Sequence, residues 1–168
     1  GPSCEVAPAF KGEKTMGTAS QVSSIRSDSV TEGDPNPISA VMEDLRRTFD
    51  SERTRPLEWR RSQLEAAIRM VTENEGEIVA ALRSDLGKPE TESLVAEVAY
   101  TVGEARYLLK RLAGWLKPKR VATPMMAQPG RSYLHKDPLG VVCVIAPWNY
   151  PFQLAMVPAL GAVAAGNC

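Results

Sequence analysis

The strongest constraint on this chain is a short polar loop placed between two apolar segments near its carboxyl end. Residues 141–146, VVCVIA, form a continuous apolar run rich in β-branched residues, which is typical of a strand buried on both faces of a parallel sheet. Residues 151–165 are richer in Ala, Leu and Met and favour a helix, although Pro158 should weaken or kink it. The loop PWNYPF (147–152) joins the two segments. This order predicts a strand–loop–helix unit that opens an α/β domain.

Composition narrows the class of protein and its partners. The 168 residues are enough for one domain with a hydrophobic core, and no apolar run is long enough to span a membrane. Twenty Lys and Arg side chains balance 20 Asp and Glu, which argues against a nucleic acid or an anionic membrane as the main partner. Three cysteines and one histidine match no zinc spacing and no disulfide framework. We therefore expect no metal site and a reducing compartment.

The amino-terminal part divides into a leader and a series of helices. Residues 1–36 show neither helical nor strand periodicity, and we expect a disordered leader. From Pro37 onward, apolar residues recur at helical spacing, with Arg60, Arg61 and Arg69 placed off the apolar stripe. The stripes are Val41, Leu45 and Phe49, then Leu57, Leu64, Ile68 and Val71, then Ile78, Leu82 and Leu86. Gly87 and Pro89 predict the end of the third helix.

A longer helix is expected over about residues 90–116, where apolar residues alternate by three, four and seven. A coiled-coil seam is the rival interpretation, but the stripe covers fewer than four heptads and so favours packing within a domain. The helix dipole favours acidic residues at the start and basic residues at the end. The sequence supplies Glu90, Glu92 and Glu97 early, and Lys110, Arg111 and Lys117 late.

Several other motifs have structural interpretations. Residues 131–137, RSYLHKD, mix polar and apolar side chains as an edge strand does, which places His135 in solvent. The segment GAVAAGNC (161–168) has the glycine spacing of a P-loop but lacks the Lys and Ser/Thr that contact phosphate and metal. Small residues that allow close helix–sheet packing explain it better. Cys143 and Cys168 lie in apolar surroundings and are interpreted as buried, inert thiols.

Asn149 is the polar residue with the clearest chemical use. It follows a predicted strand at its carboxyl end, where ligands of open α/β sheets gather. Its side chain can offer two N–H donors to a developing negative charge without adding charge of its own. A turn in which Asn149 bonds its own backbone is the alternative, and chemistry alone slightly favours that alternative.

A family resemblance changes this balance. PLGVVCVIAPWNYPFQLAMVPALGAVAAGN (138–167) resembles the aldehyde dehydrogenase superfamily, which carries this strand, this Trp-Asn loop and this helix. The stretch RTFDSERTRPLEWRRSQLEAAIRMVTENEGEIVAALRSDLGKPETES (47–93) looks like the N-terminal helices of the class 3 branch. The likeness extends over roughly residues 38–168, in two separate blocks that occur in the same order.

The resemblance implies oxidation of small-molecule aldehydes to carboxylic acids with NAD or NADP, through a thioester on a cysteine. Asn149 matches the residue whose amide helps to bind the oxyanion. The backbone at Ile145, Ala146, Pro147 and Trp148 matches a wall against the cofactor, and Tyr150 matches a residue of the substrate tunnel. The family also implies a homodimer. A cytoplasmic location is expected, with plastid and mitochondrion left open.

The predicted architecture is thus α/β, with N-terminal helices leading into a Rossmann-like parallel-sheet cofactor domain that is truncated at Cys168. Residues 37–168 would form the N-terminal part of the aldehyde dehydrogenase domain, divided into a helical lead-in (37–117) and the start of the NAD(P)-binding region (118–168). The nucleophilic cysteine and the glutamate base are expected beyond Cys168, so the 168-residue chain alone should be inactive. Two alternatives remain: an acylating or semialdehyde-type dehydrogenase or reductase on the same scaffold, or a non-enzymatic helical interaction module.

Overall fold

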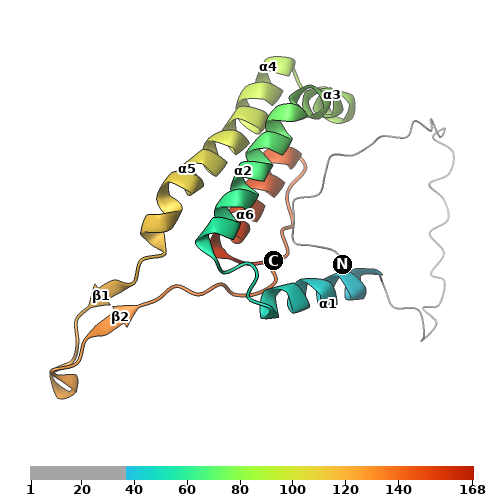
Figure 1. Cartoon of the computed structure of the whole chain (residues 1–168). Coiled ribbons are helices and arrows are strands. Elements are labelled where there is room, and N and C mark those ends of the chain that lie inside the picture. The colour runs from blue at the N-terminus through green and yellow to red at the C-terminus, as the bar shows by residue number, and fades with distance from the viewer. Residues whose placement is uncertain (1–36) are drawn as a thin grey trace.

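The computed structural model describes residues 37–168, and the leader predicted over residues 1–36 lies outside this range. Helices dominate the described chain, with a narrow two-stranded arm extending to one side (Figure 1). The first helices are α1 (Pro37–Asp50), α2 (Leu57–Glu73) and α3 (Glu75–Leu86). A continuous helical segment follows as α4 (Glu90–Glu92), the π-helix η1 (Ser93–Ala99) and α5 (Tyr100–Trp115), and α6 (Pro151–Ala165) comes last.

These bounds confirm the predicted helices. Gly87 ends α3 in the left-handed conformation, with φ of 64°, and its N–H donates to the carbonyl of Arg83. The long helix runs from Glu90 to Trp115, and α6 occupies the predicted residues 151–165 with Pro151 at its first position. Pro158 lies inside α6, which continues through it.

The core lies where α2, α5 and α6 pack against one another (Figure 1). One buried cluster joins all three helices, and a second lies where α2 meets η1 and α5. The first cluster consists of Leu64, Ala67, Ala105, Leu112, Leu160 and Ala164, and the second consists of Val71, Val98 and Val102. Each fully buried Leu or Val side chain contributes about 1.5–3 kcal/mol to folding. The apolar stripes of the sequence thus make the contacts that hold α6 in place.

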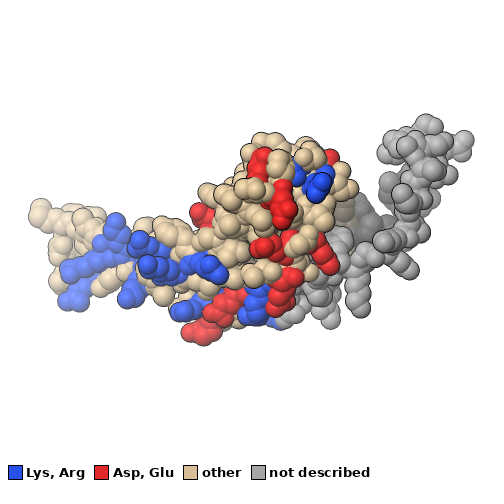
Figure 2. Space-filling view, turned by 90° about the horizontal axis from the view of Figure 1, so that it is seen from above, with Lys and Arg blue, Asp and Glu red and all other residues tan. Residues whose placement is uncertain are grey.

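The arm is an antiparallel pair, β1 (Lys119–Val121) and β2 (Ser132–Leu134), with Arg120 opposite Tyr133. A short 3₁₀ turn, η2 (Met125–Ala127), lies near its tip. Figure 2 shows Lys and Arg side chains gathered along this arm, whereas Asp and Glu side chains gather over the helices. The edge strand predicted within residues 131–137 is confirmed, and His135 is exposed just after it.

The predicted burial of residues 141–146 is wrong. The run forms no continuous strand, and Val142 and Ile145 are exposed. One parallel pairing is present around Val141, because Cys168 N–H donates to the Gly140 carbonyl while Val142 N–H donates to the Cys168 carbonyl. Side chains of a strand are buried by elements packed on its two faces, and the exposure of Val142 and Ile145 shows that these side chains are not covered in this way. Cys143 is consequently exposed and Cys168 half-buried, so neither is the fully buried thiol expected.

None of the helices described in residues 37–168 combines the length and the apolar character needed to cross a bilayer.

Candidate functional site

The predicted site residues 145–150 form one continuous loop that runs from residues 141–144 into the start of α6. Asn149 is exposed, as are Pro147, Ile145 at 92% and Trp148 at 85%, whereas Ala146 and Tyr150 are half-buried. The structure therefore leaves the Asn149 amide open to solvent at the amino-terminal end of a helix. Its neighbours Ile145 and Trp148 add apolar surface on the approach to it.

Lys88 binds the backbone of this loop. It lies between α3 and α4 and is 7% exposed. Its Nζ donates to the Asn149 carbonyl oxygen at 2.9 Å and forms a buried ion pair with the Glu97 carboxylate. A charge-assisted hydrogen bond of this kind is about twice as strong as a neutral one. Asn149 is thus fixed through its main chain while its side chain stays free to meet a ligand.

Glu97 acts as the cap of α6 from another helix. Glu97 lies in η1 and is fully buried, and its Oε2 accepts a hydrogen bond from the Gln153 N–H at 2.8 Å. Gln153 is in the first turn of α6, where backbone N–H groups lack partners within the helix, and the N-cap residue Tyr150 makes no side-chain cap. A carboxylate at this end also interacts favourably with the helix dipole. Glu97 therefore fixes the direction in which α6 leaves the loop.

Tyr150 is held at both its hydroxyl and its ring. The hydroxyl donates to Glu92 Oε1 at 3.0 Å, and Lys88 Nζ lies 3.6 Å from the ring centroid. The hydrogen bond to the Glu92 carboxylate, which favours the protonated phenol, raises the pKa of Tyr150 above its usual value. The ring is therefore held by Glu92 and by Lys88, and Lys88 also holds the Asn149 backbone.

The π-helical winding of η1 explains how Glu92 and Glu97 reach the same loop. A π-helix bonds residue i to residue i+5, so residues five apart lie near one another on its surface. In an α-helix, positions five apart point in different directions. Glu92 directly precedes this wide turn and Glu97 lies inside it, and their carboxylates bind Tyr150 and Gln153. Single π-turns inside α-helices are frequent at functional sites.

The sequence alone does not predict the roles of Lys88 and Glu97. Lys88 lies between a predicted helix end and a proline and carried no assigned role, and Glu97 was placed with the acids that favour the helix dipole. A usable signal existed, because Glu97 follows Leu94 by three residues and so borders the apolar stripe of the long helix. A carboxylate at that position needs a buried partner.

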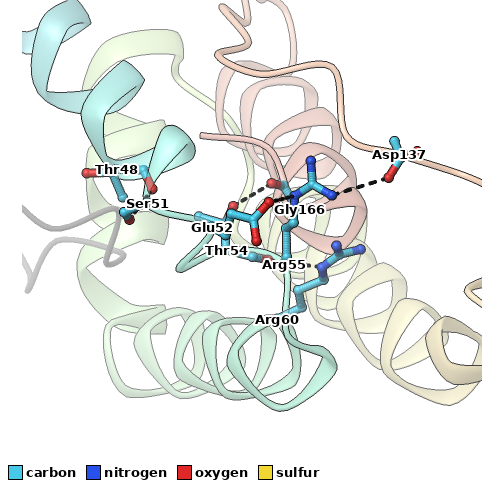
Figure 3. Close-up of polar contacts among 8 residues, drawn as sticks. All are labelled: Thr48, Ser51, Glu52, Thr54, Arg55, Arg60, Asp137 and Gly166. Atoms are coloured by element: carbon cyan, nitrogen blue, oxygen red, sulfur yellow. Dashed lines mark hydrogen bonds and ion pairs between the residues drawn. The ribbon is translucent and has the colours of Figure 1, made fainter.

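The carboxyl end of α6 is fixed by a second polar cluster (Figure 3). Thr54 is fully buried, and its Oγ1 donates to the Gly166 carbonyl oxygen at 2.7 Å. Arg60 donates from Nε to the Thr54 carbonyl at 3.0 Å and from Nη1 to the Ala164 carbonyl at 3.4 Å. Burial of the guanidinium, together with nearby Arg55, lowers the pKa of Arg60. Arg60, which the sequence placed off the apolar stripe, is therefore buried, because carbonyls at the end of α6 accept from its donors.

Asn167 ties the same end of α6 to the segment that leads into the loop. Its Oδ1 accepts from the N–H groups of Leu139 and Gly140, at 2.7 and 3.0 Å, while its Nδ2 donates to the Ala162 carbonyl at 3.2 Å. Both the approach to the loop and the helix that leaves it are therefore anchored. The arrangement can present one neutral amide, at a defined place, to an oxygen that gains negative charge.

Residues 145–148 fit one wall of a dinucleotide site. They are uncharged, and Ile145, Pro147 and Trp148 are exposed, which suits contact with the apolar faces of a ring and a sugar. They include no glycine and no basic side chain, so they do not form a phosphate cradle.

Comparison with known proteins identifies the family. Residues 11–168 match the Aldehyde dehydrogenase family. The chain is 42% identical over 132 residues to "Aldehyde dehydrogenase family 3 comG" of Dictyostelium discoideum, and 46% identical over 128 residues to "Aldehyde dehydrogenase" of Craterostigma plantagineum. These alignments cover 79% and 76% of this chain, but 28% and 27% of the relatives.

A solved structure agrees with this assignment. The chain superposes on the substrate-bound Staphylococcus aureus AldH with a TM-score of 0.76 and 38% identity, covering 79% of this chain and 29% of that one. The chain therefore belongs to the aldehyde dehydrogenase family, and it is class 3-like, since relatives named family 3 are among its matches. It spans somewhat over a quarter of the length of the curated relatives it matches.

Proposed function

We propose that the whole protein oxidises aldehydes to carboxylic acids with NAD or NADP, and that Asn149 supplies one donor to the oxyanion. The observation that carries this proposal is an exposed amide on a loop whose backbone is anchored by Lys88 and whose helix is capped by Glu97. Family membership supports the reaction class. One relative, from Canis lupus familiaris, is named "Aldehyde dehydrogenase, dimeric NADP-preferring", which supports NAD(P) use and a homodimer.

In this proposal Asn149 acts on the carbonyl oxygen of the aldehyde. When a cysteine thiolate adds to the carbonyl carbon, the C=O electron pair moves to the oxygen, which becomes an alkoxide. The Asn149 Nδ2–H group donates to that oxygen, and the donation strengthens as the charge grows. The cofactor, when bound, accepts a hydride. The nucleophilic cysteine and the glutamate base are expected outside this chain, so the 168-residue chain alone should be inactive.

Residues 118–168 are proposed as the start of the cofactor-binding region, after the helical lead-in of residues 37–117. Ile145, Ala146, Pro147 and Trp148 would form one wall of the cofactor site. Tyr150 would line the path of the aldehyde, where an aromatic ring suits apolar substrates. The expected location is cytoplasmic. Plastid and mitochondrion are the alternatives, and a relative from Arabidopsis thaliana that is named chloroplastic supports the plastid among them.

The test is steady-state kinetics of the whole protein, with formation of the reduced cofactor from an aliphatic aldehyde as the signal. Asn149→Ala should lower kcat by about 10²–10³ and leave the KM for the cofactor nearly unchanged, because the amide acts on a charge that develops in the transition state. Gln128→Ala, which removes an exposed amide on the arm, is the matched control and should keep full activity. Unchanged kcat in Asn149→Ala, with chemistry shown to limit turnover, would remove Asn149 from this role.

A further inference from the structure

We infer that Lys88 and Glu97 are positioning residues for Asn149, and that this buried ion pair sets where the Asn149 amide lies in the active site. This inference rests on the proposed function. It adds a role for two residues that touch neither the aldehyde nor the cofactor and act through the loop backbone.

The first step is the direct contact between Lys88 and Asn149. The Asn149 side chain is exposed, so packing does not fix it. The anchor is the main-chain carbonyl, which accepts the Lys88 Nζ hydrogen bond at 2.9 Å. Lys88 is itself immobilised, because its Nζ also pairs with Glu97 and lies over the Tyr150 ring. A shift of Lys88 would therefore move Asn149 and Tyr150 together.

The second step is the contact between Glu97 and α6. Glu97 Oε2 binds the Gln153 N–H, four residues after Asn149, while Oε1 binds Lys88. One carboxylate thus joins the first turn of α6 to the lysine that holds the Asn149 carbonyl. Glu97 is fully buried and lies in a helix packed on the core, so the ion pair is attached to the core of the molecule. The loop is held on both sides of Tyr150.

The third step connects this geometry to rate. An oxyanion hole requires its donors at about 2.7–3.1 Å from the oxygen that gains charge. A misplacement of about 1 Å at a reacting centre can cost about 10²-fold in rate. Since the oxyanion exists only after attack, a displaced Asn149 should lower kcat and leave the KM for the cofactor nearly unchanged. Loss of Lys88 should thus lower kcat as loss of Asn149 does, but by a smaller factor.

A double-mutant cycle on the whole protein tests the inference. Lys88→Met and Glu97→Gln are each made in the wild-type and in the Asn149→Ala background, and kcat is measured in all variants that fold. We expect each change to lower kcat about 10-fold or more in the wild type and to have little further effect once the Asn149 amide is gone. The same fold-loss in both backgrounds, or no loss in the wild type, would overturn the inference. Lys110→Met, which replaces an exposed lysine of α5, should keep full activity.

Hydrogen exchange supplies a readout that does not depend on activity. In Glu97→Gln the Gln153 amide should exchange about 10-fold faster than in the wild type, whereas amides in the middle of α5 should be unchanged. Unchanged exchange at Gln153 would show that Glu97 does not hold the loop. If the wild-type protein forms no reduced cofactor from any aldehyde, the proposed function fails, and the exchange result still decides whether the ion pair positions the loop. Glu97→Gln is nearly isosteric and keeps an acceptor oxygen, so it serves if Lys88→Met does not fold.

Discussion

Thr54 and Gly166 are 112 residues apart in sequence and are joined by a 2.7 Å hydrogen bond from the threonine hydroxyl to the glycine carbonyl (Figure 3). The bond links the turn before α2 to the residue that ends α6. Because Thr54 is fully buried, water cannot replace the donor when it is lost. The contact therefore fixes α6 along its length, with Glu97 holding the opposite end.

Thr54→Val should lower the free energy of unfolding by about 1–3 kcal/mol, because the Gly166 carbonyl would lose a donor in a dry site. Denaturant unfolding followed by circular dichroism measures this change. Thr72→Val is the matched control, since the Thr72 hydroxyl donates to the Ile68 carbonyl within α2 on an exposed surface. Its effect should stay within about 0.5 kcal/mol. Equal effects of the two substitutions would contradict the assigned role of Thr54.

Gly166→Ala should destabilise the protein for two reasons. Gly166 has φ of 92°, a conformation that costs a residue with a Cβ about 1–2 kcal/mol. An added Cβ would also lie 2.5 Å from Arg60 Nη2 and displace the guanidinium from its carbonyl partners. Gly103→Ala is the control, because Gly103 lies in α5 with nothing within 4 Å of the added Cβ. It should stabilise by about 0.5–1 kcal/mol, so the shifts in Tm should have opposite signs.

Removing one partner of the Lys88–Glu97 pair should cost more stability than removing both charges. Lys88→Met leaves a buried carboxylate without its cation, for which a loss of about 3–5 kcal/mol is typical. The double variant Lys88→Met/Glu97→Gln should recover part of that loss in urea unfolding. Arg55→Met, which removes an exposed ion pair with Asp137, should change stability by about 1 kcal/mol or less. A double variant less stable than Lys88→Met would contradict this expectation.

The helices were accessible from the sequence because their signals are local. Residues 151–165 carry a helical composition with a proline at the first position, and α6 has those bounds. Leu64, Val71, Val98 and Val102 lie on the predicted stripes and are buried. Apolar periodicity is decided within one helix, so it needs no knowledge of the partner.

The polar contacts around α6 were not accessible, because their partners are distant in sequence. Glu97 bonds an amide 56 residues away, and Arg60 bonds a carbonyl 104 residues away. Periodicity assigns such charges to the surface, since only the folded structure shows the carbonyls and amides that compensate them. The burial expected of residues 141–146 was wrong for a related reason, because strand burial depends on neighbouring strands and not on composition alone. The chemical roles assigned to Asn149 and Tyr150 remain predictions.

The raised pKa of Tyr150 predicts a pH-dependent contribution to stability. The hydrogen bond to Glu92 keeps the phenol protonated in the native state to higher pH than in the unfolded chain. The unfolded state therefore loses this proton first, near the ordinary tyrosine value of about 10, and stability falls as pH rises from there through the native pKa. Below that range the contribution is fully present and does not vary with pH.

Tyr150→Phe isolates this effect. The difference in unfolding free energy between wild type and Tyr150→Phe should be constant from about pH 7 to 9 and should decrease above about pH 10. Urea unfolding at a series of pH values measures the difference, and ultraviolet titration of tyrosinate follows the group itself. Glu92→Gln, which removes the charge but keeps an acceptor at the same place, should move the Tyr150 titration back toward its ordinary range. A Tyr150 titration that does not respond to Glu92→Gln would show that the carboxylate is not the cause.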